Sequence, residues 1–200
     1  MKYSTLMLIG LLLFSLESRS QKAESHSSSI ITGAEQTDLY LPQLKGKRVA
    51  IMANPTSMIG ERHLVDSLLS LNINVVKVFA AEHGFRGKAS AGVSIADGID
   101  KATGVPVVSL YGKKNKPSTA DLSDVDIVIY DLQDVGVRFY TNINALSRLM
   151  EACEANGKSM MIFDRPNPNG YLIDGPILDM KYKSGIGMFP LPMSHGLTVG

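Results

Sequence analysis

The sequence has little of three features that would by themselves define a protein class: cysteine, net charge and long apolar runs. Cys153 is the only cysteine, so an internal disulfide is excluded. It falls inside a predicted helix, where we expect a small core residue. The apolar run from Leu6 to Phe14 is shorter than the roughly 20 residues that a membrane-spanning helix needs.

That short run instead has the pattern of an export signal. Lys2 precedes it, and Ser18-Arg19-Ser20 supplies small residues where a signal peptidase cleaves. We predict a signal peptide over residues 1–20, cleavage near Ser20, and a periplasmic or secreted protein with no stable membrane anchor. An uncleaved anchor is the alternative.

The absence of net charge argues against a nucleic-acid partner. Without residues 1–20 the chain has equal numbers of basic and acidic residues, 18 of each. Because a basic field supplies most of the affinity for nucleic acid, we expect no nucleic-acid partner.

Several catalytic and cofactor motifs are also missing. No Gly-x-Gly-x-x-Gly or Walker loop occurs, and no Gly-x-Ser-x-Gly elbow is present to supply a serine nucleophile. The histidines show no metal-ligand spacing. We therefore expect neither a cofactor nor a metal, although an oxygen-only metal site stays open.

The pattern of apolar runs predicts an α/β fold. The Ser-rich segment 21–36 is typical of a flexible linker, and a domain is expected over residues 37–200. Strands are predicted over 48–53, 74–81, 105–112, 126–130 and 159–163, and helices over 63–71 and 144–156. Strands joined by crossover-length segments pair in parallel. This predicts a Rossmann-like parallel sheet with helices on both faces, without a dinucleotide fingerprint.

Polar residues follow three of these strands. Because parallel strands end at one sheet edge, we expect the three groups to meet there. They could supply a general acid, a second carboxylate and anion-binding arginines, or could form a structural ion-pair network. The groups are Glu82, His83 and Arg86; Asp131, Gln133, Asp134 and Arg138; and Asp164, Arg165 and Asn167.

Five motifs in order carry a resemblance: Glu82–Gly87, Ser109–Gly112, Asp131–Thr141, Asp164–Pro168 and Ser194–Gly200. Together they resemble the exo-β-N-acetylmuramidase (NamZ-like) family of peptidoglycan-recycling glycosidases. The resemblance implies hydrolysis of a terminal, non-reducing N-acetylmuramic acid from a peptidoglycan-derived muropeptide or disaccharide. It also implies a C-terminal domain beyond residue 200, with the site in a cleft between the domains.

The resemblance and the strand-end pattern agree on Glu82 as the proton donor. Asp131 or Asp134, or with less support Asp164, would be the second carboxylate, and retention or inversion stays open. The lactyl carboxylate of N-acetylmuramic acid calls for an arginine, with Arg86 ranked before Arg138 and Arg165. The other predicted substrate contacts are His83, Gln133, Tyr140, Asn167 and His195. The alternative function is a non-catalytic muropeptide-binding module.

Overall fold

The structure is a computed structural model that describes residues 30–87, 97–112 and 114–200. The predicted signal peptide and the start of the predicted linker lie outside these residues. Within the described ranges, no helix has the length and apolar character that crossing a bilayer requires.

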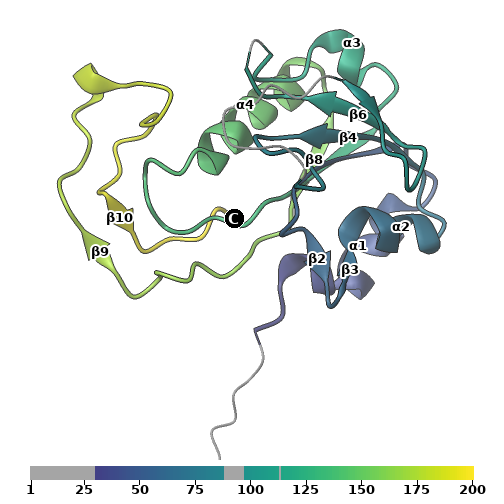
Figure 1. The fold of residues 1–200 in the computed structure, drawn as a ribbon, viewed down its shortest axis with the longest axis horizontal. Helices are drawn as coiled ribbons and strands as arrows, with labels where there is room; N and C mark the ends of the chain where they lie inside the picture. Colours follow the sequence, from purple (N-terminus) through teal and green to yellow (C-terminus); the bar gives the residue numbers. More distant parts are fainter. Residues whose placement is uncertain (1–29, 88–96, 113) are drawn as a thin grey trace, which may run out of the picture.

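A six-stranded sheet forms the centre of the fold, in the order β5-β6-β4-β1-β7-β8 (Figure 1). Five strands are parallel and correspond to the five predicted ones, and β5 pairs antiparallel with β6. The predicted α/β, Rossmann-like fold is therefore confirmed. The strands are β1 (Val49–Ala53), β4 (Val75–Ala80), β5 (Gly98–Ile99), β6 (Pro106–Ser109), β7 (Ile127–Asp131) and β8 (Ser159–Ile162).

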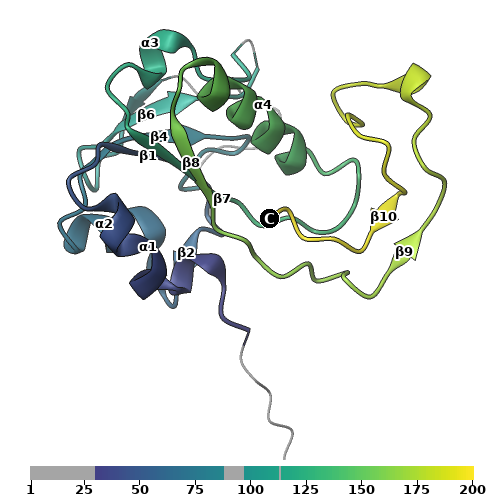
Figure 2. The same ribbon diagram turned by 180° about the vertical axis from the view of Figure 1, so that it is seen from behind.

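Helices cover both faces of this sheet (Figures 1 and 2). On one face α1 (Thr37–Leu44) and α2 (Leu64–Ser70) pack over alternate strand residues such as Ile51 and Ile129. On the other face lie α3 (Thr119–Leu122) and α4 (Asn142–Ala155). Because successive side chains of a strand point to opposite faces, the chain builds two separate apolar cores.

The sequence explains the end of α4. The Gly157 N–H donates to the Glu154 carbonyl and the Lys158 N–H to the Cys153 carbonyl. Gly157 has a φ of 60°, so it supplies the left-handed residue that closes such a helix. The predicted glycine cap is present, and Cys153 is buried in the core as expected.

The predicted linker is wrong at its C-terminal end. A 3-10 helix, η1 (Gly33–Glu35), comes before α1, and Ala34 is fully buried. The Gly33 N–H donates to the Asp164 carbonyl at 2.8 Å. A Cβ on Gly33 would lie 2.6 Å from the Asp164 nitrogen, so only glycine permits this approach. The segment is therefore anchored to the end of β8 before Thr37.

Two small hairpins complete the fold. The first, β2 (Met58–Ile59) with β3 (Arg62–His63), lies between β1 and α2. The second lies within residues 171–197, which we call the arm: β9 (Ile173–Asp174) pairs antiparallel with β10 (Ser194–His195). The arm also contains the 3-10 helix η2 (Met180–Tyr182). It projects from the body of the molecule and returns to a C-terminus between the two (Figures 1 and 2).

Candidate active site

The parallel strands bring the predicted polar groups to one edge of the sheet. Ala53 of β1 pairs with Ala80 of β4 on one side and with Asp131 of β7 on the other. Tyr130 of β7 pairs in turn with Ile162 of β8. The residues that follow β4, β7 and β8 therefore start at similar heights along one edge, as the predicted topology required.

Glu82 follows β4 and is half-buried. Its Oε1 accepts a hydrogen bond from the Tyr111 hydroxyl at 2.8 Å. This bond raises the pKa of Tyr111 above its ordinary value. Tyr111 lies just beyond β6, the strand next to β4. Tyr111 was not among the predicted site residues, although its place in the motif Ser109–Gly112, at the end of a predicted strand, was a signal for it.

A tight turn follows Glu82 directly. His83, Gly84 and Gly87 have φ values of 69°, 75° and 66°. His83 has an exposed side chain, and a residue other than glycine in this region carries backbone strain, which is found most often at functional sites. A Cβ on Gly87 would lie 2.6 Å from the Pro55 ring, so glycine lets the turn close on the segment after β1.

Arg86 is held by two protein carboxylates. Its guanidinium donates to both Asp66 oxygens at 2.8 and 2.9 Å and to both Asp100 oxygens at 2.8 and 3.1 Å. It also lies 4.7 Å from the centre of the Phe85 ring. These hydrogen bonds hold the pKa values of Asp66 and Asp100 below their ordinary range. The arginine ranked first for the substrate carboxylate thus fastens its own loop to α2 and to the residue after β5.

Asp131 and Arg165 form a buried ion pair. The Arg165 Nε and Nη2 donate to the two Asp131 oxygens at 2.6 and 3.0 Å, and Asp131 has no exposed surface. Burial raises the pKa of Asp131, and the Arg165 guanidinium opposes that rise. Arg165 Nη2 also donates to the Met58 carbonyl, and the Ser57 hydroxyl donates to the Asp131 carbonyl. The pair joins β7, the residues after β8 and the hairpin after β1.

Asp134 and His195 form a second buried pair, 3.5 Å apart between Oδ2 and Nε2. Asp134 is 3% exposed and His195 4%. Asp134 Oδ2 accepts from the Gly136 N–H, and His195 Nδ1 accepts from the Leu197 N–H at 3.2 Å. In neutral His195 the proton is therefore on Nε2, facing Asp134. Among the described residues, neither this Nε2 nor Asp134 Oδ1 has a hydrogen-bond partner.

Three of the predicted contacts connect loops to one another. Gln133 Nε2 donates to the Asp134 and Pro166 carbonyls at 2.6 and 2.8 Å. Asn167 Nδ2 donates to the Leu197 carbonyl at 3.0 Å. Asp164 Oδ2 accepts from the Thr198 hydroxyl and its Oδ1 from the Gly200 N–H. These contacts support the structural ion-pair and hydrogen-bond alternative for this part of the edge.

Arg138 differs from the other two candidate arginines. Its Nη1 donates to the Pro176 and Leu191 carbonyls, both at 2.8 Å. Within the described part of the chain, no carboxylate lies within ion-pair distance of it, so its positive charge is not compensated there. Tyr140, two residues further on, is 38% exposed.

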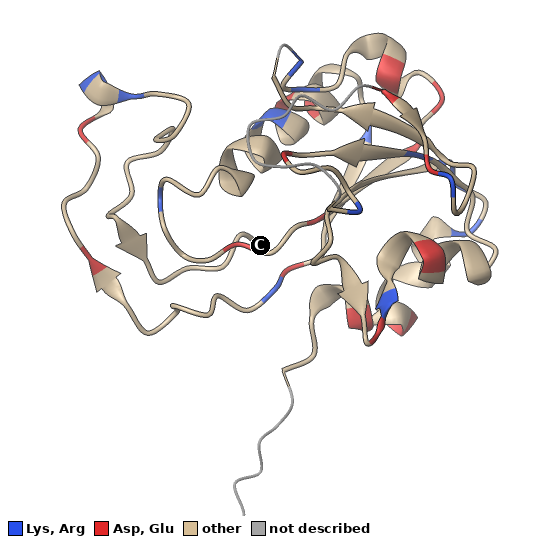
Figure 3. Ribbon diagram, viewed as in Figure 1, with Lys and Arg blue, Asp and Glu red and all other residues tan. Residues whose placement is uncertain are grey.

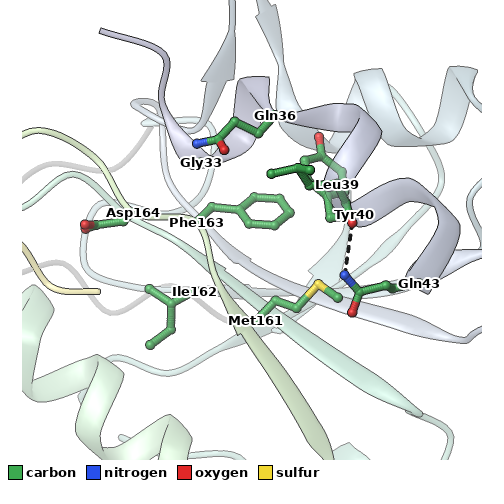
Figure 4. Close-up of a pocket in the computed structure, with 9 residues that line it drawn as sticks. All are labelled: Gly33, Gln36, Leu39, Tyr40, Gln43, Met161, Ile162, Phe163 and Asp164. Carbon is green, nitrogen blue, oxygen red and sulfur yellow. Dashed lines mark hydrogen bonds between the residues drawn. The ribbon is translucent and has the colours of Figure 1, made fainter.

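A pocket of about 360 Å³ lies on the outer side of β8, against η1 and α1 (Figure 4). Asp164 is the only charged group in its lining. Glu82 follows β4, three strands away from β8 in the sheet. The lining residues are Gly33, Gln36, Leu39, Tyr40, Gln43, Met161, Ile162, Phe163 and Asp164.

The edge therefore combines two half-buried carboxyl groups, Glu82 and Asp164, with two buried, paired ones, Asp131 and Asp134. A half-buried carboxyl that a neighbour orients suits proton transfer to a substrate in a crevice. Within residues 30–87, 97–112 and 114–200, no cluster of three or more His, Cys, Asp or Glu side chains is arranged to hold a metal ion.

Comparison with known proteins places the chain in a family. A family profile described as Exo-beta-N-acetylmuramidase NamZ, N-terminal, matches residues 49–200. A Bacillus subtilis (strain 168) protein named Peptidoglycan beta-N-acetylmuramidase NamZ is 41% identical over 203 residues. The match covers 96% of this chain and 49% of that protein.

Two crystal structures of DUF1343 family proteins from Bacteroides fragilis NCTC 9343 have the same fold, each with a TM-score of 0.75. One is 53% identical, over 85% of this chain and 44% of its own. The other is 38% identical, over 84% and 43%. The chain spans about half the length of these relatives. The resemblance that the motifs carried is confirmed, and the chain belongs to the family defined by the N-terminal region of NamZ.

Proposed function

We propose that this chain carries the proton donor of an exo-acting glycoside hydrolase. The enzyme releases terminal, non-reducing N-acetylmuramic acid from peptidoglycan fragments after export to the periplasm or the medium. The observation that carries this proposal is Glu82, half-buried at the sheet edge and oriented by the Tyr111 hydroxyl. The 41% identity to a protein named as a peptidoglycan β-N-acetylmuramidase supports the substrate class.

In this mechanism Glu82 protonates the glycosidic oxygen as the bond to the anomeric carbon breaks. The hydrogen bond from Tyr111 restricts the rotation of the carboxyl group, so the acid is held in position before substrate binds. The strained turn that directly follows Glu82 presents the exposed side chain of His83, the next residue in the sequence after the acid.

The two main candidates for the second carboxylate, Asp131 and Asp134, are more tightly paired than the sequence suggested. Asp131 is buried against Arg165, and Asp134 is buried beside His195. Asp131 is paired through both of its oxygens, and Asp134 through Oδ2. Their burial favours assistance by water or by the sugar's own 2-acetamido group over direct attack by either residue. Asp164 is the more exposed of the three candidates.

For the lactyl carboxylate, the geometry gives most support to Arg138. Arg86 and Arg165 already donate to protein carboxylates, whereas the Arg138 partners are two carbonyl oxygens. A guanidinium with uncompensated charge attracts an anion more strongly than one in an ion pair. We therefore propose Arg138, in place of Arg86, as the group that distinguishes N-acetylmuramic acid from N-acetylglucosamine.

The direct test is turnover of a chromogenic N-acetylmuramide. Glu82→Gln keeps the shape of the side chain but removes the acid, so we expect turnover with a poor leaving group to fall about 10²-fold or more. Glu154→Gln, the same change at an exposed position on α4, is the control and should behave as wild type. Activity of Glu82→Gln within a few-fold of wild type would assign proton donation to another residue.

A muropeptide-binding module is the second candidate, because Arg138 and the exposed Tyr140 could hold the sugar even if no acid is correctly positioned. Calorimetric titration with the same N-acetylmuramide separates the two. Saturable binding without release by the wild-type chain would favour the module, and hydrolysis that depends on Glu82 would favour the enzyme.

Specificity gives a second test. Arg138→Met should remove most of the preference for N-acetylmuramic acid over N-acetylglucosamine, about 10- to 150-fold for a charge-assisted contact. Arg138→Lys keeps the charge and should keep most of the preference. Rates on both chromogenic sugars give the ratio. If Arg138→Met keeps the wild-type ratio, another group reads the lactyl carboxylate.

A further inference from the structure

The order in which the strands are added to the sheet reverses next to β1. From β1 the chain extends the sheet through β4 and β6 on one side, and later through β7 and β8 on the other. The helix that follows β1, α2, packs on one face of the sheet, and the helix that follows β7, α4, packs on the opposite face. The chain therefore leaves β1 and β7 toward opposite faces. In open α/β sheets, ligands bind at such a reversal, beyond the carboxyl ends of the strands.

The turn after β1, residues 54–57, lies at this reversal and contacts the segments on both sides. On the β4 side, a Cβ on Gly87 would lie 2.6 Å from the Pro55 ring, so the turn after β4 packs directly on it. On the β7 side, the Gln133 N–H donates to Thr56 Oγ1 at 3.2 Å. The turn is therefore fixed between the two strand ends that supply Glu82 and Asp131.

Asn54 is the first residue of this turn, and all of its polar groups but one have a partner. Its N–H donates to the Ser57 hydroxyl at 3.0 Å, and its carbonyl oxygen lies 3.0 Å from His63 Nε2. Its Oδ1 accepts from the Thr56 N–H at 2.9 Å and from the Thr56 hydroxyl at 2.5 Å. A backbone N–H can only donate, so the atom that faces it must be the oxygen. Within the part of the chain that the structure describes, the Nδ2 group then has no hydrogen-bond partner.

A fixed amide donor without a partner fits a neutral acceptor on a ligand. Asn54 is half-buried, and its two hydrogen bonds from Thr56 hold the amide in one orientation. Residues 54–57 include no charged side chain, whereas the segments after β4, β7 and β8 all carry charged residues (Figure 3). Those segments suit ionised groups, and the Nδ2 of Asn54 suits a carbonyl oxygen.

The position of Asn54 relative to the proton donor identifies this carbonyl. Ala53 of β1 pairs with Ala80 of β4, so Asn54 and Glu82 follow two paired strands. In N-acetylmuramic acid the anomeric carbon, at which the acid acts, is bonded to the carbon that carries the 2-acetamido group. The lactyl group is one carbon further away. The acetamido carbonyl is therefore the neutral acceptor next to the reacting bond.

We propose that Asn54 is a specificity-determining residue, which donates from Nδ2 to the carbonyl oxygen of the 2-acetamido group. Asn54 has this role only if the ligand is N-acetylmuramic acid, so the inference rests on the proposed function. The sugar is then recognised by two separate groups, Asn54 for the acetamido group and Arg138 for the lactyl carboxylate. The hydrogen bond also restricts rotation of the acetamido group beside the anomeric carbon.

The test compares the binding of two monosaccharides to the 200-residue chain by calorimetric titration. One is N-acetylmuramic acid, and the other is 3-O-(1-carboxyethyl)-glucose, which has a hydroxyl in place of the acetamido group. Asn54→Asp keeps the oxygen that accepts from Thr56 and replaces Nδ2 by a second oxygen. We expect it to reduce the preference for N-acetylmuramic acid roughly 3- to 10-fold. The added charge acts on both ligands, since both have the lactyl carboxylate, and so cancels in the ratio.

A second variant removes the donor without adding charge. In Asn54→Ser the hydroxyl can accept from the N–H two residues further on, as the asparagine does, so the turn is kept. It should lose the same preference. Asn74→Asp is the matched control, because Asn74 is exposed and precedes β4, at the end of the strand away from Glu82. It should keep the wild-type ratio, and circular dichroism checks that each variant folds.

The outcomes separate the role of Asn54 from the proposed hydrolysis, because neither monosaccharide has a glycosidic bond to break. Loss of the preference in both Asn54 variants supports the role of Asn54, whatever Glu82→Gln does to turnover. A wild-type ratio in either folded variant, or equal binding of the two sugars by the wild type, would overturn it and leave proton donation by Glu82 in place. No binding of N-acetylmuramic acid by the wild type would contradict both.

Discussion

Two strand ends at the same sheet edge, those of β4 and β7, carry carboxylates in opposite environments. Glu82 is half-buried and has a tyrosine hydroxyl as donor, whereas Asp131 is fully buried and has a guanidinium. The first arrangement keeps a carboxyl group half-buried at the sheet edge, and the second uses one to hold three segments together. Position at a strand end therefore does not distinguish a reactive acid from a structural one; the partner and the burial do.

The largest expected effect tests the structural side of this comparison. Asp131→Asn leaves the Arg165 guanidinium buried without its counter-charge, so the free energy of unfolding should fall by about 3–5 kcal/mol. Urea unfolding followed by circular dichroism measures it. Asp126→Asn, which breaks the solvent-exposed pair with Arg48, is the control and should lose far less.

The double variant Asp131→Asn/Arg165→Met sharpens this prediction. If the cost comes from an unpaired buried charge, removing the charge as well should recover part of the lost stability. A single Asp131→Asn variant as stable as wild type would instead mean that the carboxylate does not brace the fold, and Asp131 would become the leading second catalytic carboxylate.

The fold was predictable because its signals are local. Apolar runs such as 49–53 and 127–131 identify the central strands, and Gly157 marks the end of α4. α1 was missed: it is short, contains Pro42, and follows a segment whose composition is that of a linker. The anchoring of Gly33 to Asp164 joins positions far apart in the sequence and has no local signal.

For the candidate site, the sequence predicted where the polar residues lie in the fold but not how they pair with one another. Polar residues after parallel strands had to meet at one edge, and they do. Which of them neutralise each other depends on long-range contacts, such as Asp131 with Arg165 and Arg86 with Asp66. The position of the arm could not be predicted either. It is fixed by hydrogen bonds from Arg138 to two backbone carbonyls, and every residue has a carbonyl, so the sequence gives no signal for these contacts.

An intermediate effect concerns Arg86, which fastens the turn beside Glu82. Arg86→Met removes its hydrogen bonds to Asp66 and Asp100, so stability at pH 7 should fall by roughly 1–2 kcal/mol, discounted for partial exposure. Arg62→Met is the control, since Arg62 is exposed and donates to Ser70.

Asp66 and Asp100 also determine how the stability lost in Arg86→Met depends on pH. The pKa values of Asp66 and Asp100 are lowered in the folded protein, so the unfolded chain takes up protons first as the pH falls. Their contribution is present above the ordinary aspartate pKa of about 3.9 and is lost as the pH drops through the lowered folded values. The difference between wild type and Arg86→Met, from urea unfolding at pH 7 and pH 3, should therefore shrink in acid; a difference that is constant or grows would contradict the role of this clamp.

The smallest effect tests the catalytic side of the comparison, through Tyr111. Tyr111→Phe removes the donor to Glu82 and keeps the ring, so turnover of the N-acetylmuramide should fall only roughly 2- to 10-fold, with stability unchanged. A residue that positions the acid should lower kcat and leave KM nearly unchanged, whereas a merely structural role would not separate the two. Tyr171→Phe, at a side chain 86% exposed on the arm, is the control and should keep both kcat and KM. If Tyr111→Phe also keeps both, the hydrogen bond does not position the acid, and the contrast between the two strand ends rests on burial alone.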